Sequence, residues 1–336
     1  MKKNYLFFVG IDVSKDKLDY CIVDVHSIDK PEFGIIANNA KAIIKFIQRI
    51  KKRGIIDEQL LFCLENTGVY SMPICYWLQS NSLDYWVVPA LEVKRSKGIT
   101  RGKTDKTDAK DISFYAITHL HDLKLSKLPE NDLIELRLLL TERDKLIKAI
   151  HLFNATKENK IFLSKEVLKT TLQGNQKTIA FLQKQLKEIE KCISLVINRN
   201  DIFKHQNELL QTIPGIGKQT AVTLIAYTQA FTLFNNHRQF ACFAGIAPFE
   251  YSSGSSVRGK TKVSNLANKK LKTILNMAAL SAKKYDPQLK QYFERKVKEG
   301  KNKMLVLNAI RCKIVSRAFA VIKRDSKFVD TLKAVA

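Results

Sequence analysis

The sequence predicts a protein of the α/β plus α class, in which an α/β domain is followed by helices. Two observations predict this. Over residues 1–125, short apolar runs typical of buried strands alternate with segments of helical period. From about residue 130 onward, apolar residues recur mainly at helical spacing among charged ones. The 336 residues, 45% of them hydrophobic, suffice for two or three domains with their own cores.

The elements of the first region follow in a definite order. Three strands are expected first, and the period then becomes helical after Asn38, with Ile43, Ile47 and Ile50 on one face. The further expected elements alternate between strand and helix. All of these segments, in chain order, are the strands Tyr5–Ile11, Leu18–Val25 and Glu32–Ile36, the helix after Asn39, the strand Gln59–Leu64, the helix Ile74–Gln79, the strand Tyr85–Val88 and a helix from about Asp108. This is the order of a ribonuclease H-like domain. A dinucleotide-binding fold would need a Gly-rich first turn, which this sequence lacks.

Two helical regions follow. Over residues 129–204 apolar residues recur at helical spacing among charges, without enough apolar surface for a separate domain. We expect a coiled-coil connector there, an antiparallel helical hairpin that bridges domains or pairs with another chain. The predicted domains are therefore residues 1–128, 129–204 and 205–336.

The net charge points to a nucleic acid partner. Lys and Arg number 57 against 32 Asp and Glu, which gives a formal charge of +25. Residues 251–336 hold 21 basic and 5 acidic side chains, or +16 of that total. A nucleic acid backbone is the usual counterpart of such a surplus, although a basic protein that is merely soluble remains the alternative. The sequence has neither a long apolar run nor a signal peptide, so we expect a soluble, cytoplasmic, nucleoid-associated protein without membrane contact.

Four carboxylates are candidates for catalysis. Asp12 follows the first strand, Glu65 ends a later one, and Asp105 and Asp108 stand three residues apart at the start of a helix. An Asp that opens a turn or caps a helix is the structural alternative for Asp12, Asp105 and Asp108. A ribonuclease H-like sheet would instead bring all four together, where they can hold two Mg²⁺ ions for phosphodiester displacement.

The C-terminal region has two further signals. Ile213–Gly217 joins two expected helices through a Gly-x-Gly turn, as in a helix-hairpin-helix that grips phosphate through backbone N–H groups; a tight interhelical turn is the alternative. A Ser/Gly loop at residues 252–256 is followed by basic residues. Such a loop is usually a flexible linker, but a serine in it can also be a nucleophile on phosphate.

These motifs resemble those of a known family, the Piv-related DEDD transposases of bacterial insertion sequences, the insertion-sequence 110 group. The likeness covers about residues 5–325, with the motifs in the expected order. They are Gly10-Ile11-Asp12-Val13-Ser14-Lys15, Glu65-x-Thr67-Gly68-x-Tyr70, Lys103-Thr104-Asp105-x-x-Asp108-Ala109, Ile213-Pro214-Gly215-Ile216-Gly217, Gly245-Ile246-Ala247-Pro248 and Ser253-Gly254.

The resemblance implies a RuvC-like domain with an acidic tetrad, Asp12, Glu65, Asp105 and Asp108, that binds Mg²⁺. It also implies a coiled-coil connector and a C-terminal transposase domain in which Ser253 attacks DNA, with Ser252 and Ser255 as alternatives. Expected partners are donor and target double-stranded DNA, a structured non-coding guide RNA, the bridge RNA, and further copies of the chain in a dimer or tetramer. The residues expected to contact nucleic acid are Lys103, Lys106, Gly215, Gly217, Lys218, Arg258, Lys260, Lys262, Lys269 and Lys270.

One segment departs from the family. After the serine loop the family usually has Ile-Ser-Lys-x-Gly-Asn and a basic pair, whereas this chain has Val263-Ser264-Asn265-Leu266-Ala267-Asn268-Lys269-Lys270.

We therefore expect a Mg²⁺-dependent DNA transposase. Three alternatives stay open: a RuvC-like Holliday-junction nuclease that uses the tetrad alone, a sugar kinase or actin-like ATPase, and a basic nucleic acid-binding protein without catalysis. The kinase alternative needs phosphate-admitting glycines after Asp12, where the chain has Val13-Ser14-Lys15.

Overall fold

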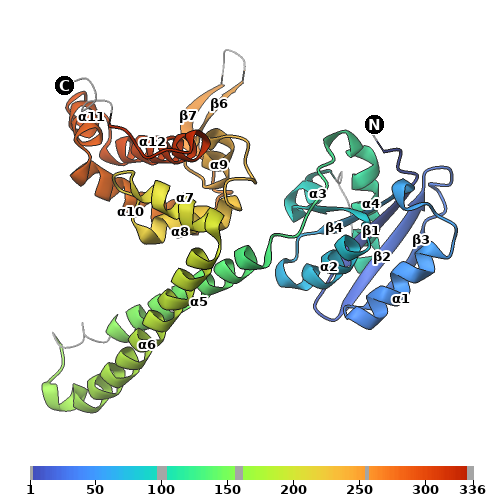
Figure 1. Cartoon of the computed structure of the whole chain (residues 1–336), viewed down its shortest axis with the longest axis horizontal. Helices are drawn as coiled ribbons and strands as arrows, with labels where there is room; N and C mark the ends of the chain where they lie inside the picture. Colours follow the sequence, from blue (N-terminus) through green and yellow to red (C-terminus); the bar gives the residue numbers. More distant parts are fainter. Residues whose placement is uncertain (1–2, 97–103, 156–161, 254–256, 331–336) are drawn as a thin grey trace. The chain divides into compact units, whose positions relative to one another are not determined.

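The computed structural model of the chain divides into two compact units, Met1–Leu128 and Pro129–Ala336 (Figure 1). It describes residues 3–96, 104–155, 162–253 and 257–330. A division of the second unit near residue 204 stays a prediction. Within these described ranges, no helix is long and apolar enough to cross a membrane.

The first unit is built on a five-stranded mixed sheet with the order β3-β2-β1-β4-β5. Strand β1 pairs antiparallel with β2 and parallel with β4, so the first three strands form a meander and the last two arrive by crossovers. The strands are β1 (Phe7–Val13), β2 (Lys17–Asp24), β3 (Glu32–Ala37), β4 (Leu60–Glu65) and β5 (Asp84–Val88).

Helices cover both faces of this sheet. The helices are α1 (Ala40–Lys51), α2 (Met72–Ser80), α3 (Ala90–Ser96) and α4 (Asp105–Thr118). Helices α1 and α2 pack on the face that carries Val9 and Ile11 of β1. Helices α3 and α4 pack on the opposite face, against Phe8 of β1 and Cys63 of β4. Because side chains alternate along a strand, Gly10 and Asp12 also belong to the α4 face.

The expected elements of this unit are present, with three differences. Strand β1 extends to Val13, so Asp12 lies inside the strand and not after it, because β2 continues to pair with β1 up to Leu18. Helix α4 begins at Asp105, three residues earlier than expected, since Thr104 and Thr107 form a capping box there. Helix α3 was not expected, and its seven residues are too few to show a helical period.

The second unit begins with two long helices, α5 (Asn131–Ala155) and α6 (Lys165–Arg199). They are antiparallel, because Arg199 at the end of α6 donates to Asp132 and Glu135 at the start of α5. The base of this hairpin contributes buried leucines of α5, such as Leu136, to the core of the unit.

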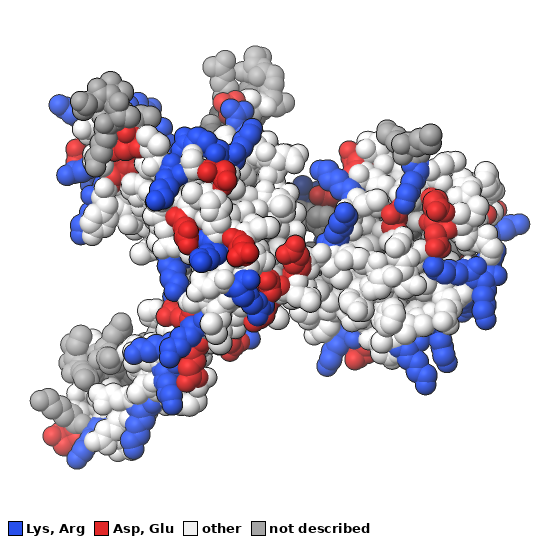
Figure 2. Space-filling view, viewed as in Figure 1, with Lys and Arg blue, Asp and Glu red and all other residues white. Residues whose placement is uncertain are grey.

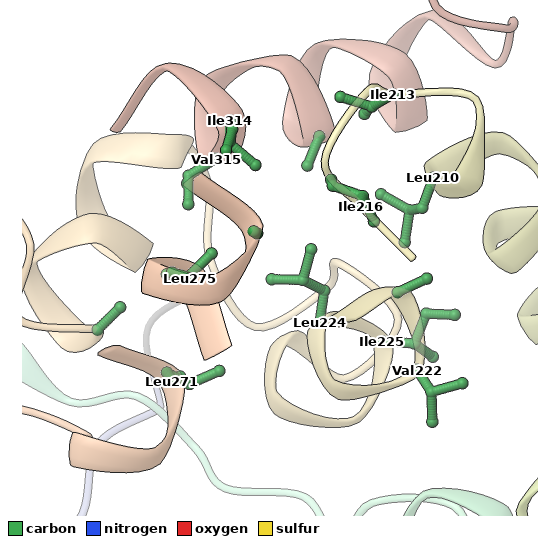
Figure 3. Packing of buried hydrophobic residues seen from close by; sticks show 14 of the residues in the cluster. Leu210, Ile213, Ile216, Val222, Leu224, Ile225, Leu271, Leu275, Ile314 and Val315 are labelled. Carbon is green, nitrogen blue, oxygen red and sulfur yellow. The ribbon is translucent and has the colours of Figure 1, made fainter. Parts of the chain in front are cut away.

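The rest of the second unit is a helical bundle with one two-stranded sheet. Its elements are α7 (Asp201–Gln211), α8 (Lys218–Thr228), α9 (His237–Phe243), β6 (Pro248–Ser253), β7 (Val257–Val263), α10 (Lys269–Tyr285), α11 (Pro287–Lys298) and α12 (Lys303–Arg324). Apolar side chains from α7, α8, α10, α12 and the turn after α7 meet in its core, among them Leu210, Leu224, Leu275 and Ile314 (Figure 3). The antiparallel β6–β7 pair was not expected, because its strands are polar and Ser/Gly-rich rather than clearly alternating.

Candidate active site

Asp12 and Glu65 stand side by side on neighbouring strands. The parallel register pairs Ile11 of β1 with Leu64 of β4, and Asp12 and Glu65 are the next residues of the two strands. Both are partly buried. Each lies two residues after a member of the α4 face, Gly10 or Cys63, so both side chains belong to that face.

Gly10 allows α4 to lie directly on β1. A Cβ built on Gly10 would stand 2.3 Å from the backbone oxygen of Ala109 and 2.4 Å from the backbone nitrogen of Ser113. The backbone of α4 therefore contacts the strand where glycine has no side chain. This contact holds the first turns of α4, with Asp105 and Asp108, on the same face as Asp12.

The two aspartates of α4 are not its N-cap. Thr104 takes that position and accepts from the backbone N–H of Thr107, while the Thr107 hydroxyl accepts from the N–H of Thr104. Asp105 and Asp108 are thus the first and fourth helical residues, where the helix dipole favours negative charge.

Asp12 lies in a partly buried and acidic environment. Burial, followed by repulsion from Asp108, Asp105, Glu65 and Asp19, raises the pKa of Asp12 to about 6. In the parts of the chain that the structure describes, no three acidic, His or Cys side chains are yet gathered closely enough to form a metal cluster. The four carboxylates therefore share one face of the sheet but do not form a finished metal cage.

The donor set suits a hard divalent cation. All four side chains offer carboxylate oxygens, the ligands that Mg²⁺ prefers. The repulsion that raises the pKa of Asp12 is also the repulsion that a cation between these carboxylates would remove. The residues present therefore fit such an ion.

Two residues of this site were missed by sequence reasoning, Asp19 and Lys17. Asp19 on β2 is the register partner of Asp12 and is only 5% exposed. The Lys17 Nζ lies 3.0 Å from Asp19 Oδ2 and 2.7 Å from Asp105 Oδ2, and these two hydrogen bonds, Asp105 first, raise the pKa of Lys17. The alternation of Lys17, Asp19, Cys21 and Val23 was the available signal, but only the register shows that Asp19 is opposite Asp12.

The basic residues expected to contact nucleic acid have different surroundings. Lys106 lies over the ring of Phe33, and Lys218 donates to the Ser194 hydroxyl. Lys270 is paired with Asp144 at 2.6 Å and therefore anchors α10 to α5. Lys262 and Lys269 are exposed, and Lys103 lies outside the described residues. For Arg258 and Lys260 the structure describes only their backbone, on β7.

The Gly-x-Gly turn joins α7 to α8, as expected. Gly215 has φ +94°, and a Cβ there would stand 2.6 Å from the backbone oxygen of Ala278. Glycine is therefore needed at this position to fit α10. Gly217 is the N-cap of α8 and has no atom near its Cβ position within the described residues, so the helix N-terminus is sterically open there.

The candidate nucleophile lies on the β6–β7 hairpin. Ser253 is the last residue of β6 and pairs with Val257, while the preceding Ser252 is exposed and pairs with Arg258. Ser255 lies outside the described residues. A groove of about 720 Å³ runs along this hairpin, lined by Cys242, Phe249, Glu250, Gly259, Lys262, Ser264 and Leu266.

A row of carboxylates on a mixed sheet, with Lys and Arg spread over the surface of both units (Figure 2), is typical of enzymes that cut and join nucleic acid. Two family models match this chain. The Transposase IS116/IS110/IS902 family matches residues 207–294, and a DEDD transposase model of the same insertion-sequence group matches residues 9–160. Together they span well over half of the chain, which therefore belongs to the insertion-sequence 110 family of transposases. It is a DNA-cleaving, strand-transferring enzyme.

Curated relatives agree with this assignment. The pilin gene-inverting proteins of Moraxella bovis and Moraxella lacunata are each 27% identical over an alignment 337 residues long, which covers 98% of this chain and 98% of theirs. An uncharacterized 43.6 kDa protein of insertion element IS110 from Streptomyces coelicolor is 25% identical over 154 residues, 46% of this chain and 36% of that protein. Among solved structures, T. thermophilus RuvC in complex with a Holliday junction substrate matches with a TM-score of 0.28 and 10% identity, over 37% of this chain and all of that one.

Proposed function

We propose that this chain is a Mg²⁺-dependent transposase with a RuvC-like first unit. In it, Asp12, Glu65, Asp105 and Asp108 hold the metal and Ser253 is the nucleophile. The observation that carries the proposal is the convergence on Asp12. Glu65 lies beside it in the register of β1 and β4, and the contact of α4 with Gly10 brings Asp105 and Asp108 to the same face. Burial, followed by repulsion from Asp108, Asp105, Glu65 and Asp19, raises the pKa of Asp12 to about 6. The strand order β3-β2-β1-β4-β5, with β2 antiparallel to β1, supports the ribonuclease H-like class to which RuvC-like domains belong.

The residues of this chain would divide the reaction between them. A divalent cation, when bound, would act as a Lewis acid on the phosphate and favour both the attacking and the leaving oxygen. The Ser253 hydroxyl would lose its proton as its oxygen bonds to phosphorus, one bridging P–O ester bond of the DNA strand would break, and the leaving oxygen would take up a proton in exchange. The carboxylates of the first unit would hold that cation.

A covalent adduct is the direct test of the serine. Labelled element-end DNA incubated with the protein and Mg²⁺ should give a denaturant-resistant protein–DNA band. Ser253→Ala should abolish the band, whereas the neighbouring Ser252→Ala should keep it. An adduct that persists in Ser253→Ala and disappears in Ser252→Ala would show that Ser252, and not Ser253, is the nucleophile.

The second candidate is a junction-resolving nuclease that uses the carboxylates alone. The same observation favours it, because the acidic site lies entirely in the first unit. It predicts that Ser253→Ala cleaves branched DNA as fast as the wild type and that no adduct forms. Asp12→Asn should abolish cleavage under either proposal.

We further propose that a structured non-coding RNA and additional copies of this chain complete the enzyme. The charge of +16 over residues 251–336 supports a large nucleic acid footprint. Exposed apolar side chains on the long hairpin support pairing with another copy, among them Leu152 at 72% exposure and Phe181 at 62%. The wild type should therefore sediment as a dimer or larger, and Leu152→Lys with Phe181→Lys should shift it toward the monomer.

Guidance by RNA has its own test. The non-coding DNA beside the gene is transcribed and added to RNA-free protein with donor and target DNA. Recombination should require this transcript and should move to a new target when its target-pairing segment is changed. Recombination by the RNA-free protein would refute guidance by RNA but would not contradict the proposed transposase activity.

A further inference from the structure

Lys17 places a positive charge inside the acidic site. Its Nζ lies 2.7 Å from Asp105 Oδ2 and 3.0 Å from Asp19 Oδ2, so one ammonium bridges β2 and the first turn of α4. Lys17 and Asp19 are two residues apart on β2 and therefore lie on the same face of the sheet. That face also carries Asp12, which is directly opposite Asp19 in the antiparallel register.

The two carboxylates that Lys17 joins differ in their exposure. The Asp19 side chain is 7% exposed, and a buried carboxylate is costly unless it is paired. Asp19 also faces Asp12, and like charges directly opposite each other in a sheet repel. The Asp105 side chain, by contrast, is 54% exposed. The charge of Lys17 is therefore needed to compensate the buried Asp19 carboxylate, whereas its ion pair with the exposed Asp105 is weak, as surface ion pairs are.

From these contacts we propose that Lys17 is the internal counter-cation of the acidic site: it gives up Asp105 to the metal ion while Asp19 keeps its ammonium in place. A divalent ion carries twice the charge of an ammonium and competes well for a half-exposed carboxylate. Because the Asp19 carboxylate is buried and needs a positive partner, Lys17 stays paired with it beside the site after the exchange. Its ammonium then remains available to an incoming phosphate.

This inference rests on the proposed metal site, and metal binding tests it without measuring activity. The probe is Mn²⁺ alone, with free Mn²⁺ measured by electron paramagnetic resonance on the full-length protein. Lys17→Met should bind Mn²⁺ about 10-fold more tightly, because a nearby positive charge is lost and the Lys17 ammonium no longer competes with the ion for Asp105. Asp19→Asn should bind Mn²⁺ several-fold more weakly. One negative charge is lost, and Lys17 then keeps its ion pair with Asp105 and competes with the metal for it.

The opposite signs separate this role from a structural one. If Lys17 and Asp19 only held the fold together, both variants would bind Mn²⁺ more weakly. Lys17→Arg keeps the charge and should bind like the wild type. Lys41→Met, on the exposed side of α1 across the sheet, removes the same charge and should change nothing. Should Lys17→Met fail to fold, Lys17→Gln removes the charge while keeping a hydrogen-bond donor for Asp19; it should also bind Mn²⁺ more tightly, and weaker binding would refute the role of Lys17.

The result for Asp12→Asn tells the two proposals apart. If it abolishes Mn²⁺ binding and Lys17→Met binds with unchanged or lower affinity, the metal site stands and the role of Lys17 is refuted. If Mn²⁺ binding survives Asp12→Asn, the metal site itself is refuted, and the inference with it. Tighter binding by Lys17→Met together with loss in Asp12→Asn supports both.

Discussion

Gly10→Ala should separate the two halves of the acidic site. The new methyl would stand 2.3 Å from the backbone oxygen of Ala109, whereas ordinary contacts begin at 3.4 Å, so α4 must move outward by about 1 Å. Backbone atoms cannot turn aside as a flexible side chain can. Overpacking of this kind costs about 1–3 kcal/mol of unfolding free energy. Asp105 and Asp108 travel with α4, and a misplacement of about 1 Å lowers catalysis about 100-fold.

Urea unfolding and cleavage of labelled DNA at saturating Mg²⁺ measure these two effects. Gly174→Ala is the matched control, because nothing that the structure describes lies within 4 Å of its Cβ position in α6. It should gain about 0.5–1 kcal/mol from helix propensity and cleave like the wild type. If Gly10→Ala is as stable and as active as the wild type, the close contact between β1 and α4 does not position the site.

Three further changes test other parts of the chain. Because the pKa of Asp12 is raised from 3.8 to about 6, its ionisation destabilises the metal-free fold as pH rises through that range, by about 1–3 kcal/mol at pH 7. Asp12→Asn should remove this loss of stability, which urea unfolding at pH 4 and pH 7 with EDTA would measure. Arg317→Leu leaves Asp286, 3% exposed, without its ion pair and should cost about 3–5 kcal/mol in thermal unfolding, against at most about 1 kcal/mol for the exposed Arg295→Leu. Gly215→Ala, at φ +94°, should lose more than about 1 kcal/mol, and an unchanged melting temperature would contradict the close packing of that turn on α10.

Sequence reasoning found most of the fold because its elements carry strong local patterns. The strands of the first unit are apolar runs, and α1 has its buried residues on one face, so period and composition sufficed. It missed α3, which is short, and the β6–β7 hairpin, whose strands are polar. These elements depend on packing and pairing with distant residues, which a local pattern does not contain.

The four carboxylates of the proposed site were predicted from the sequence, whereas their arrangement in space was not. Asp12, Glu65, Asp105 and Asp108 were identified from their places beside strands and at a helix start, and from the family motifs. Their common face follows from the parallel register of β1 and β4 and from the contact of α4 with Gly10. Asp19 shows what is lost without a register: in the sequence it is a polar residue in a strand, and only its pairing with Asp12 places it in the site.

The distribution of charge between the two units has a consequence for how DNA can be processed. Negative charge gathers at Asp12, whose pKa is raised by burial and by repulsion from Asp108, Asp105, Glu65 and Asp19, and Lys17 pairs with two of these carboxylates, Asp19 and Asp105. Without metal, this negative charge repels a phosphodiester. The attraction for DNA must then come from elsewhere, and residues 251–336 carry +16. Binding and cleavage should therefore respond differently to metal removal. With EDTA, DNA affinity and its steep salt dependence should persist while cleavage stops, and a loss of affinity equal to the loss of cleavage would show that the acidic site itself holds the DNA.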